Sequence, residues 1–282
     1  MAPIDVPGAQ LGRVGERPGL FRYIAELWSY RSFVFYNARS RLQSQNTSHF
    51  LGNLWLVLTP VLNGLTYFLI FGILLQTSRG VQNFLGFLII GVFMFQFTSR
   101  SVSGGARSLQ QNRNVVRAFQ FPRATLPLAE NLRELMGFMP GFVAMFALIL
   151  LLPPSEPVSW KWLLVIPVLA LQFLLNLGLS LFIARLVSTV SDFAQLIPFA
   201  LRLWMYGSGV FYSFERFVSH PTALAILEFN PMHQVLDITR NAILYDSVSS
   251  PQSWLILACW SIGTLAVGLV FFWASEEKYG AE

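Results

Sequence analysis

Residues 84–103 read FLGFLIIGVFMFQFTSRSVS, and this stretch decides the fold. It contains a single charged residue, Arg100, near its end. A helix rises about 1.5 Å per residue, so about 20 such residues cross the hydrocarbon core of a bilayer. Backbone polar groups find no water in lipid and must bond to one another, which favours a helix. The stretch therefore predicts a membrane-spanning helix.

The same pattern recurs along the chain. The 282-residue sequence is 54% hydrophobic and only 12% charged, whereas a soluble domain carries about 25% charged residues. Too little charge remains to cover a globular surface in water. We therefore predict an all-α membrane protein with six transmembrane helices, near residues 51–75, 84–103, 135–152, 163–187, 193–214 and 254–273.

The arginines indicate the orientation. They gather before the first apolar block and between the second and third, whereas the first hairpin carries only Arg79 and the next outer connection only Lys161. The positive-inside rule then places the N-terminus in the cytoplasm, and six spans return the C-terminus to the same side. Residues 1–19 and 275–282 are expected to be cytoplasmic tails, the first of them disordered. This loop-bound charge also argues against nucleic acid as a partner.

Residues 20–50 mix aromatic and apolar side chains with arginines. Such a segment suits an amphipathic helix in the membrane interface, with rings at headgroup depth and arginines near phosphates. The membrane lipids would then be its partner. The alternative is a helix surrounded by water.

The arginine-rich loop between the second and third blocks contains a short helix pattern at about residues 109–122. Its polar flanks surround apolar side chains, which suits docking into the groove of a partner protein. The alternative is a solvated positive-inside loop. The candidate docking residues are Asn112, Arg113, Asn114, Val115, Val116, Arg117 and Phe119.

Residues 215–248 are too long for a turn, yet neither half is long enough to span a bilayer. The segment is amphipathic and is interrupted at Pro231, which favours a helix break. We predict two short helices that re-enter the membrane from the outer face before the last span.

Motifs for catalysis are missing from the sequence. No G-x-x-x-x-G-K-[S/T] loop could hold a nucleotide phosphate, and the three histidines are scattered without metal-ligand spacing. No carboxylates gather on one face near a span. The chain is therefore not expected to be an enzyme, and no catalytic residue, metal or cofactor of its own is assigned.

Arg202 would lie about 15 Å into the fifth span, where a charge normally faces a cavity or a partner. It could face a translocation path and attract an anionic substrate, or form an ion pair within the bundle. Aromatic rings also gather on the first and fifth spans, where they could stack on sugar rings or simply pack and face lipid. The candidate channel-lining residues are Trp55, Tyr67, Phe68, Phe199, Arg202, Tyr206, Phe211 and Tyr212.

Three segments carry a family resemblance. They are Leu51-Gly52 followed by Trp55 and Pro60; Phe121-Pro122-Arg123 followed by Leu126-Pro127-Leu128; and Asn230-Pro231-Met232 followed by Arg240. In this order and spacing the chain resembles the permease subunits of ABC-2 polysaccharide exporters, of the O-antigen and teichoic-acid type. Two places depart from the family pattern: Ser191-Asp192 replaces Arg-Asp, and Ser208-Gly209 replaces Ser-Pro.

The resemblance implies a homodimer bound to two copies of a separate P-loop ATPase, which would hold ATP and Mg²⁺. Residues 112–119 would be the helix that couples to this ATPase. The first and fifth spans would line the channel, and Asn230, Pro231, Met232 and Arg240 would form an outer-face motif. Access of a lipid pyrophosphate headgroup would involve Leu51, Gly52, Arg39 and Arg41.

The function implied by the resemblance is ATP-driven export of a polyprenyl-pyrophosphate-linked polysaccharide across a bacterial cell membrane. Only two of the 19 basic residues, Lys161 and Lys278, are lysines, which suggests a GC-rich genome such as that of an actinobacterium. The glycan implied by the resemblance is O-antigen-like or, in an actinobacterium, a galactan. The alternative is an ABC-2 exporter of small drugs or lipids. A membrane glycosyltransferase and an ion-coupled carrier are disfavoured, because neither a carboxylate cluster nor an internal repeat is found.

Overall fold

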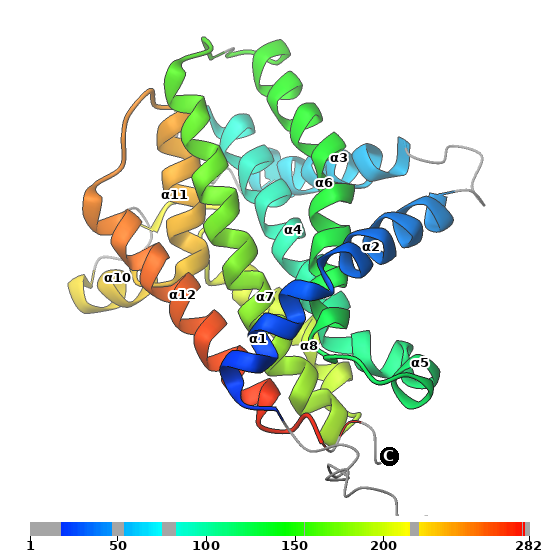
Figure 1. The fold of residues 1–282 in the computed structure, drawn as a ribbon. Helices are drawn as coiled ribbons and strands as arrows, with labels where there is room; N and C mark the ends of the chain where they lie inside the picture. The colour runs from blue at the N-terminus through cyan, green and yellow to red at the C-terminus, as the bar shows by residue number, and fades with distance from the viewer. Residues whose placement is uncertain are drawn as a thin grey trace, which may run out of the picture.

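The computed structural model describes residues 18–46, 54–74, 83–154, 156–214, 220–277 and 279. Within these ranges every regular element is a helix and no strand occurs (Figure 1). Four helical segments are long and apolar enough to cross a membrane: α4 (Phe84–Gln111), α6 (Thr125–Leu151), Trp160–Thr189 and α12 (Pro251–Trp273). The predicted all-α architecture is confirmed, with four helices able to span a membrane.

The remaining elements are shorter or continue these four. They are α1 (Leu20–Ser29), α2 (Arg31–Asn46), α3 (Leu54–Tyr67), the π-helix η1 (Phe68–Leu74), α5 (Arg113–Ala118), the 3₁₀-helix η2 (Trp160–Leu164), α7 (Val165–Thr189), α8 (Phe193–Tyr206), α10 (Pro221–Glu228) and α11 (Pro231–Ile243).

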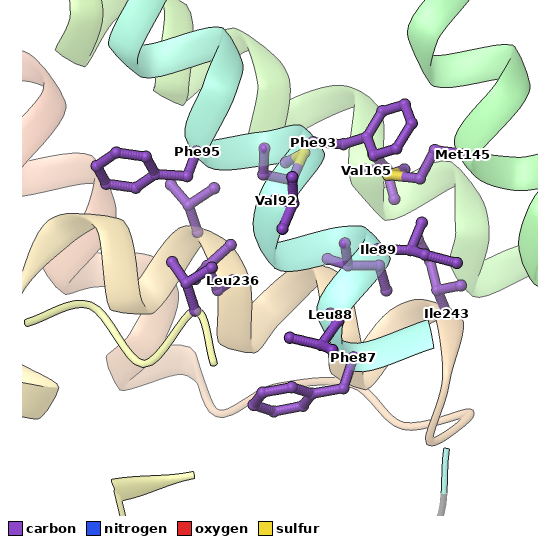
Figure 2. Packing of buried hydrophobic residues seen from close by; sticks show 14 of the residues in the cluster. Phe87, Leu88, Ile89, Val92, Phe93, Phe95, Met145, Val165, Leu236 and Ile243 are labelled. Carbon is purple, nitrogen blue, oxygen red and sulfur yellow. The ribbon is translucent and has the colours of Figure 1, made fainter. Parts of the chain in front are cut away.

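Helix α4 lies at the centre of the bundle and packs against α6, α7 and α11. Its first four turns carry a nearly unbroken apolar surface, so it buries side chains in every direction (Figure 2). Met145 of α6, Val165 of α7 and Leu236 of α11 meet this surface. A helix that is apolar all round is suited to such a central position.

Helices α7 and α12 approach each other through two glycines. A side chain at Gly178 would collide with the backbone of Thr264 and Leu265, and one at Gly268 would collide with the backbone of Gly178. In lipid, helices associate through close packing rather than through escape from water, so small residues are favoured at their contacts. This pair therefore fixes α12 against the bundle.

The first and fifth predicted spans differ from continuous α-helices. The first is α3 followed directly by the π-helix η1, and residues 75–80 lie outside the described ranges. The fifth is α8, which ends at Tyr206 and is followed by a turn in which Gly209 has φ +68°. A positive φ is unfavourable for residues with a Cβ, so glycine permits the helix to end here. The six-span arrangement stays a prediction.

The predicted single helix at residues 20–50 is two helices that meet at Tyr30. The hydroxyl of Ser29 donates to the Glu26 carbonyl at 2.7 Å, so a side chain competes for a carbonyl at the end of α1. Helix α1 packs against α12, and α2 packs against α6. Phe21 and Trp28 project outward from α1 and are exposed.

The short helices α5 and η2 lie at opposite ends of the bundle (Figure 1). Helix α4 leads into α5, and α6 starts next to α5 and ends near η2, so we name the two ends the α5 end and the η2 end. The predicted helix at 109–122 is shorter, because α4 extends to Gln111 and α5 ends at Ala118. The predicted pair within 215–248 is observed as α10 and α11, with Pro231 as the first residue of α11.

Candidate functional site

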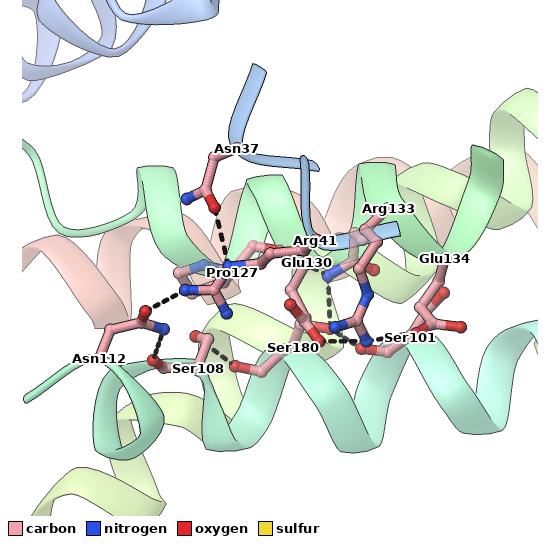
Figure 3. A network of polar contacts seen from close by, with 12 residues as sticks. Asn37, Arg41, Ser101, Ser108, Asn112, Pro127, Glu130, Arg133, Glu134 and Ser180 are labelled. Carbon is pink, nitrogen blue, oxygen red and sulfur yellow. Dashed lines mark hydrogen bonds and ion pairs between the residues drawn. The ribbon is translucent and has the colours of Figure 1, made fainter. Parts of the chain in front are cut away.

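A polar network at the α5 end joins α2 to the corner between α4 and α5 (Figure 3). The Arg41 guanidinium donates to Asn37 Oδ1 at 2.8 Å and to Asn112 Oδ1. Asn112 is buried, ends α4, begins α5, and donates to the Ser108 carbonyl at 2.6 Å. Arg41 and Asn112, which the sequence assigned to two different sites, are therefore parts of one contact.

A cluster of buried and partly buried charges lies beside this network in α6. Arg133 Nη2 contacts Glu130 Oε1 and Glu134 Oε1, both at 2.5 Å. Gly104 of α4 leaves room for Glu130, because a Cβ there would lie 2.9 Å from Glu130 Oε1. Charges in a helix that is apolar enough to span a membrane need partners. The cluster was not predicted from the sequence, although the three-residue spacing of Glu130 and Arg133 is a helical ion-pair signal.

Helix α5 presents most of its predicted docking residues to solvent. Phe119 is 66% exposed, and Val115 is exposed one turn before it. Arg113, Asn114 and Arg117 are also exposed.

One predicted docking residue faces the interior. The sequence predicts that Val116 is exposed together with Val115, but Val116 is only 5% exposed and packs in a cluster with Tyr23 and Leu109. Adjacent residues of a helix point in different directions, so only one of the two valines faces outward.

A buried carboxylate joins both ends of the chain directly behind α5. Glu276 accepts hydrogen bonds from the Tyr23 hydroxyl at 2.8 Å and from the Arg123 backbone N–H at 2.8 Å. The Tyr23 oxygen accepts from the Ala124 N–H at 3.1 Å, and the Arg123 side chain donates to the Glu276 carbonyl. Glu276 is 7% exposed, and this burial raises the pKa of its carboxyl despite these hydrogen bonds.

Glu276 falls within residues 275–282, which the sequence predicts to be a cytoplasmic tail. Its hydrogen-bond partner Tyr23 is 253 residues away in the chain, so no local sequence pattern indicates this contact. Burial also raises the pKa of the Tyr23 hydroxyl, which therefore stays protonated and able to donate. Helix α1, the segment after α5 and the end of α12 are thus held as one unit.

Aromatic rings from η1 and from the turn after α8 form a second cluster. Phe211 is fully buried, stacks on Phe71 with 4.5 Å between ring centroids, and lies 4.6 Å from Tyr67. The Tyr206 ring lies 5.5 Å from Phe211, and the Tyr212 hydroxyl donates to the Tyr206 carbonyl at 2.8 Å. Four of the predicted channel residues are thus brought together. Phe211 packs inside the protein rather than facing a path.

The Asn-Pro-Met segment and Arg240 hold this turn in place. Asn230 accepts from the Trp204 indole at 2.9 Å and donates to the Gly207 carbonyl at 2.8 Å. Arg240 is buried and donates to the carbonyls of Gly209 at 2.9 Å and of Val210 at 3.1 Å. The predicted outer-face motif is therefore a clamp between α11 and the end of α8.

Within that motif, Asn230 also caps α11, because its Oδ1 accepts from the Met232 N–H at 3.0 Å. Met232 is completely buried, and Thr98 of α4 donates to its sulfur at 3.6 Å. Pro231 begins α11, where its missing N–H costs nothing.

The remaining predicted residues lie on outward faces or outside the described ranges. Phe199 is 69% exposed, Trp55 is exposed, and Phe68 is half-buried. Arg202 is exposed and makes no hydrogen bond or ion pair with any other residue that the structure describes. Arg39 is exposed on α2, and Leu51 and Gly52 lie outside the described residues.

Among the described residues, no group of three or more His, Cys, Asp or Glu side chains could hold a metal ion. Instead, hydrogen bonds hold the turns between helices in place, and neighbouring helix faces are exposed. Such an arrangement is suited to docking and to guiding a ligand.

Comparison with known proteins identifies the family of the chain. The family model described as "ABC-2 type transporter" matches residues 33–244. The O-antigen export system permease protein RfbA of Myxococcus xanthus is 26% identical over 261 residues, which cover 92% of this chain and 96% of that protein.

Two further relatives come from other bacteria. The protein RfbA of Klebsiella pneumoniae, of the same description, is 25% identical over 245 residues, with coverage of 84% and 89%. The polysialic acid transport protein KpsM of Escherichia coli is 21% identical over 228 residues, with coverage of 80% and 87%. The resemblance inferred from the motifs is thereby confirmed at the level of the family. The family model covers well over half of the chain, and this multi-pass membrane protein belongs to the ABC-2 type transporter family.

Proposed function

We propose that this chain is the transmembrane permease of an ATP-driven exporter that moves a polyprenyl-pyrophosphate-linked polysaccharide out of the cytoplasm. The observation that carries the proposal is the corner at Asn112, where an exposed short helix is clamped to α2 through Arg41. A rigid helix of this kind can transmit movement from a partner to the bundle. The named relatives export O-antigen and transport polysialic acid, which favours a polysaccharide as cargo.

The partner at the α5 end would be a separate P-loop ATPase that binds ATP and Mg²⁺. The exposed Val115 and Phe119 offer an apolar contact, and Arg113 and Arg117 surround it with positive charge. An exposed aromatic anchor within a polar rim is typical of protein interfaces. Asn112 and the buried Val116 would position this surface rather than touch the partner.

The translocation path would form between two copies of the chain. Leu196, Phe199, Leu203 and Tyr206 recur along one exposed face of α8, and Arg202 lies beside them. A face that is both apolar and charged fits neither lipid alone nor water alone, so it suits the wall of a channel between protomers. The proposal includes six spans, with α3–η1 and α8 as the first and fifth.

In the same proposal, α10 and α11 re-enter from the outer side, and both termini are cytoplasmic. The exposed Arg39 would meet the pyrophosphate headgroup, whereas Arg41 would act through Asn112. A galactan is the proposed glycan within this class.

The test is purification of the permease with its ATPase, followed by ATP-dependent movement of a lipid-linked glycan in vesicles. The double variant Val115→Ala with Phe119→Ala is expected to lose the ATPase, and Trp160→Ala, an exposed aromatic at the η2 end, is the matched control. Movement of small drugs or lipids without any glycan would favour the alternative function and overturn the proposal.

The path assignment has a test of its own. Arg202→Gln is expected to lower glycan movement about tenfold while ATPase binding and ATP hydrolysis persist, because only attraction of an anionic group is lost. Arg202→Lys should restore most of the movement. Unchanged export by the Arg202→Gln variant would show that α8 does not line the translocation path.

A further inference from the structure

A cavity of about 890 Å³ lies at the η2 end, bordered by α10, α11, the first turns of α12 and the turn after α8. Phe87, in the first turn of α4, forms part of its wall, which fixes its place at the end of the bundle opposite α5. Its volume falls in the range of about 300–1,000 Å³ found for small-molecule sites. None of the relationships described so far accounts for it.

The wall of this cavity combines carboxylates and amides with aromatic rings. Glu228 and Asp237 contribute carboxylates, and Gln234, Asn241 and Gln252 contribute amides. The rings come from Tyr212, Phe214, Phe229 and Tyr245.

Several of these groups are held in fixed positions. Asn241 donates to Asp237 Oδ2 at 3.1 Å and to Ser249 Oγ at 2.8 Å. The Phe229 carbonyl accepts from the Trp260 indole at 2.9 Å, which fixes the backbone that carries the exposed Phe229 ring. A site whose groups are already oriented loses less entropy when a ligand binds.

Two buried polar atoms of residues that line the cavity lack hydrogen-bond partners. Gln234 is only 5% exposed, and its amide N–H donates to the Glu228 carbonyl, while its Oε1 has no hydrogen-bond partner. The Nε of the buried Arg240 likewise lacks a partner. Buried polar atoms without partners are uncommon in folded proteins and call for an explanation.

The chemistry of the wall separates the ligand classes. An acyl chain would cover the polar groups of the wall without bonding to them, and a phosphate would meet two carboxylates, Glu228 and Asp237, against the guanidinium of Arg240. A metal ion lacks a cluster of three ligands among the described residues. A sugar matches both the polar groups and the aromatic rings of the wall, because its C–H faces stack on aromatic rings and its hydroxyls donate to carboxylates and amide oxygens.

We propose that this cavity binds one or a few sugar residues of the neutral part of the glycan on the outer side of the membrane. The inference rests on the proposed polysaccharide export and adds a binding site for the emerging chain. Occupancy would hold the glycan after it leaves the path and oppose its return.

The test uses the permease–ATPase complex in lipid nanodiscs, since detergents with sugar headgroups would compete. A panel of neutral galactose, glucose and rhamnose tetrasaccharides is added, and binding is measured by saturation-transfer NMR. Glu228→Gln and Phe229→Ala are expected to weaken binding about tenfold each, because one loses a carboxyl oxygen that accepts hydrogen bonds and the other a stacking surface. The exposed Gln252→Ala serves as a third variant that is not expected to disturb folding.

Matched controls lie at the same end of the bundle but outside the cavity. Asp246→Asn changes an exposed carboxylate that pairs with Lys161 at 3.0 Å, and Trp160→Ala removes an exposed ring. Both controls are expected to bind the tetrasaccharides as the natural protein does.

Absence of binding by every tetrasaccharide, or binding that all three cavity variants leave unchanged, overturns the assignment. If ATP-dependent glycan movement persists in that case, the proposed function stands and only the cavity assignment fails. If tetrasaccharides bind but no glycan moves with ATP, the proposed function fails separately.

Discussion

The guanidinium of Arg41 in α2 donates a hydrogen bond to the side-chain carbonyl of Asn112, the residue that ends α4 and begins α5. The two residues are 71 positions apart in the chain. Because Asn112 is buried and also bonded to Ser108, a displacement of α5 has to move α2 or break this contact. The helix proposed for the membrane interface and the helix proposed for ATPase docking are therefore mechanically joined.

Arg41→Ala is expected to lower the free energy of unfolding by about 1–3 kcal/mol, because the buried Asn112 loses a charged hydrogen-bond partner. Asn112→Ala should cost a similar amount. The double variant should cost less than the sum of the two, with a coupling energy of at least about 0.5 kcal/mol. Thermal or denaturant unfolding in nanodiscs measures these values.

Arg39→Ala is the matched control, since this arginine lies on the same helix and is exposed. It should change stability by less than about 0.5 kcal/mol. Strict additivity of Arg41→Ala and Asn112→Ala would show that the contact has no energetic role.

The two adjacent valines of α5 are expected to respond differently. Val116→Ala should lower stability by about 2 kcal/mol, since a buried methyl-rich side chain is removed from its cluster with Tyr23 and Leu109. Val115→Ala should leave stability nearly unchanged and weaken ATPase binding. Unfolding curves measure stability, and pull-down of the ATPase measures binding. If Val116→Ala lost ATPase binding at full stability, the assignment of Val116 to the protein interior and of Val115 to the docking surface would be reversed.

The buried Glu276 predicts a pH dependence of stability. Its pKa in the folded protein is raised above the ordinary value of 4.5, chiefly by burial. Between these two pKa values the folded protein binds more protons than the unfolded chain, so the free energy of unfolding falls as the pH rises through this window. Stability from this group is fully present below about pH 4.5 and is lost above the raised pKa.

Glu276→Gln should remove this slope while it keeps the shape of the side chain. Glu276→Ala should also leave the Tyr23 hydroxyl and the Arg123 N–H without their acceptor, at a cost of about 1–3 kcal/mol. Glu277→Gln changes the exposed neighbour and serves as the control. A slope that survives in Glu276→Gln would assign the titration to another group.

Much of the architecture follows from local sequence. Residues 84–103 predict α4 because a backbone in lipid has few alternatives to a helix. The same reasoning misses where helices end, since it detects only their lipid-facing part: α4 extends to Gln111, and α6 begins at Thr125 rather than near residue 135. Hydropathy does not distinguish a helix from a loop in the polar residues at those helix ends.

The site is less accessible to sequence reasoning, because its contacts join distant segments. A short helix is observed where the sequence predicts one, but the inward direction of Val116 depends on Tyr23 and the chain after α5. Glu276 looked like part of a polar tail, and only the fold shows its contact with Tyr23. The Asn-Pro-Met segment was recognised as a motif, whereas its role in clamping the turn after α8 required the structure.

That turn gives the last prediction. Gly209 has φ +68°, and Arg240 donates to its carbonyl. Proline fixes φ near −65°, so the Ser-Pro that the family resemblance implies could not adopt the turn seen here at Ser208-Gly209. Gly209→Pro is therefore expected to disrupt the clamp and to lower stability by about 3 kcal/mol or more.

Gly209→Ala should cost about 1–2 kcal/mol, and Gly209→Asn should cost less, because asparagine tolerates positive φ better than alanine. Gly263→Ala in α12 is the control, since a Cβ there meets nothing within 4 Å and alanine favours a helix. Unfolding of each variant in nanodiscs ranks the costs. A Gly209→Pro protein as stable as the natural one would show that the turn can form with a negative φ at this position. The hydrogen bonds of Arg240 to the turn would then not require its present backbone geometry.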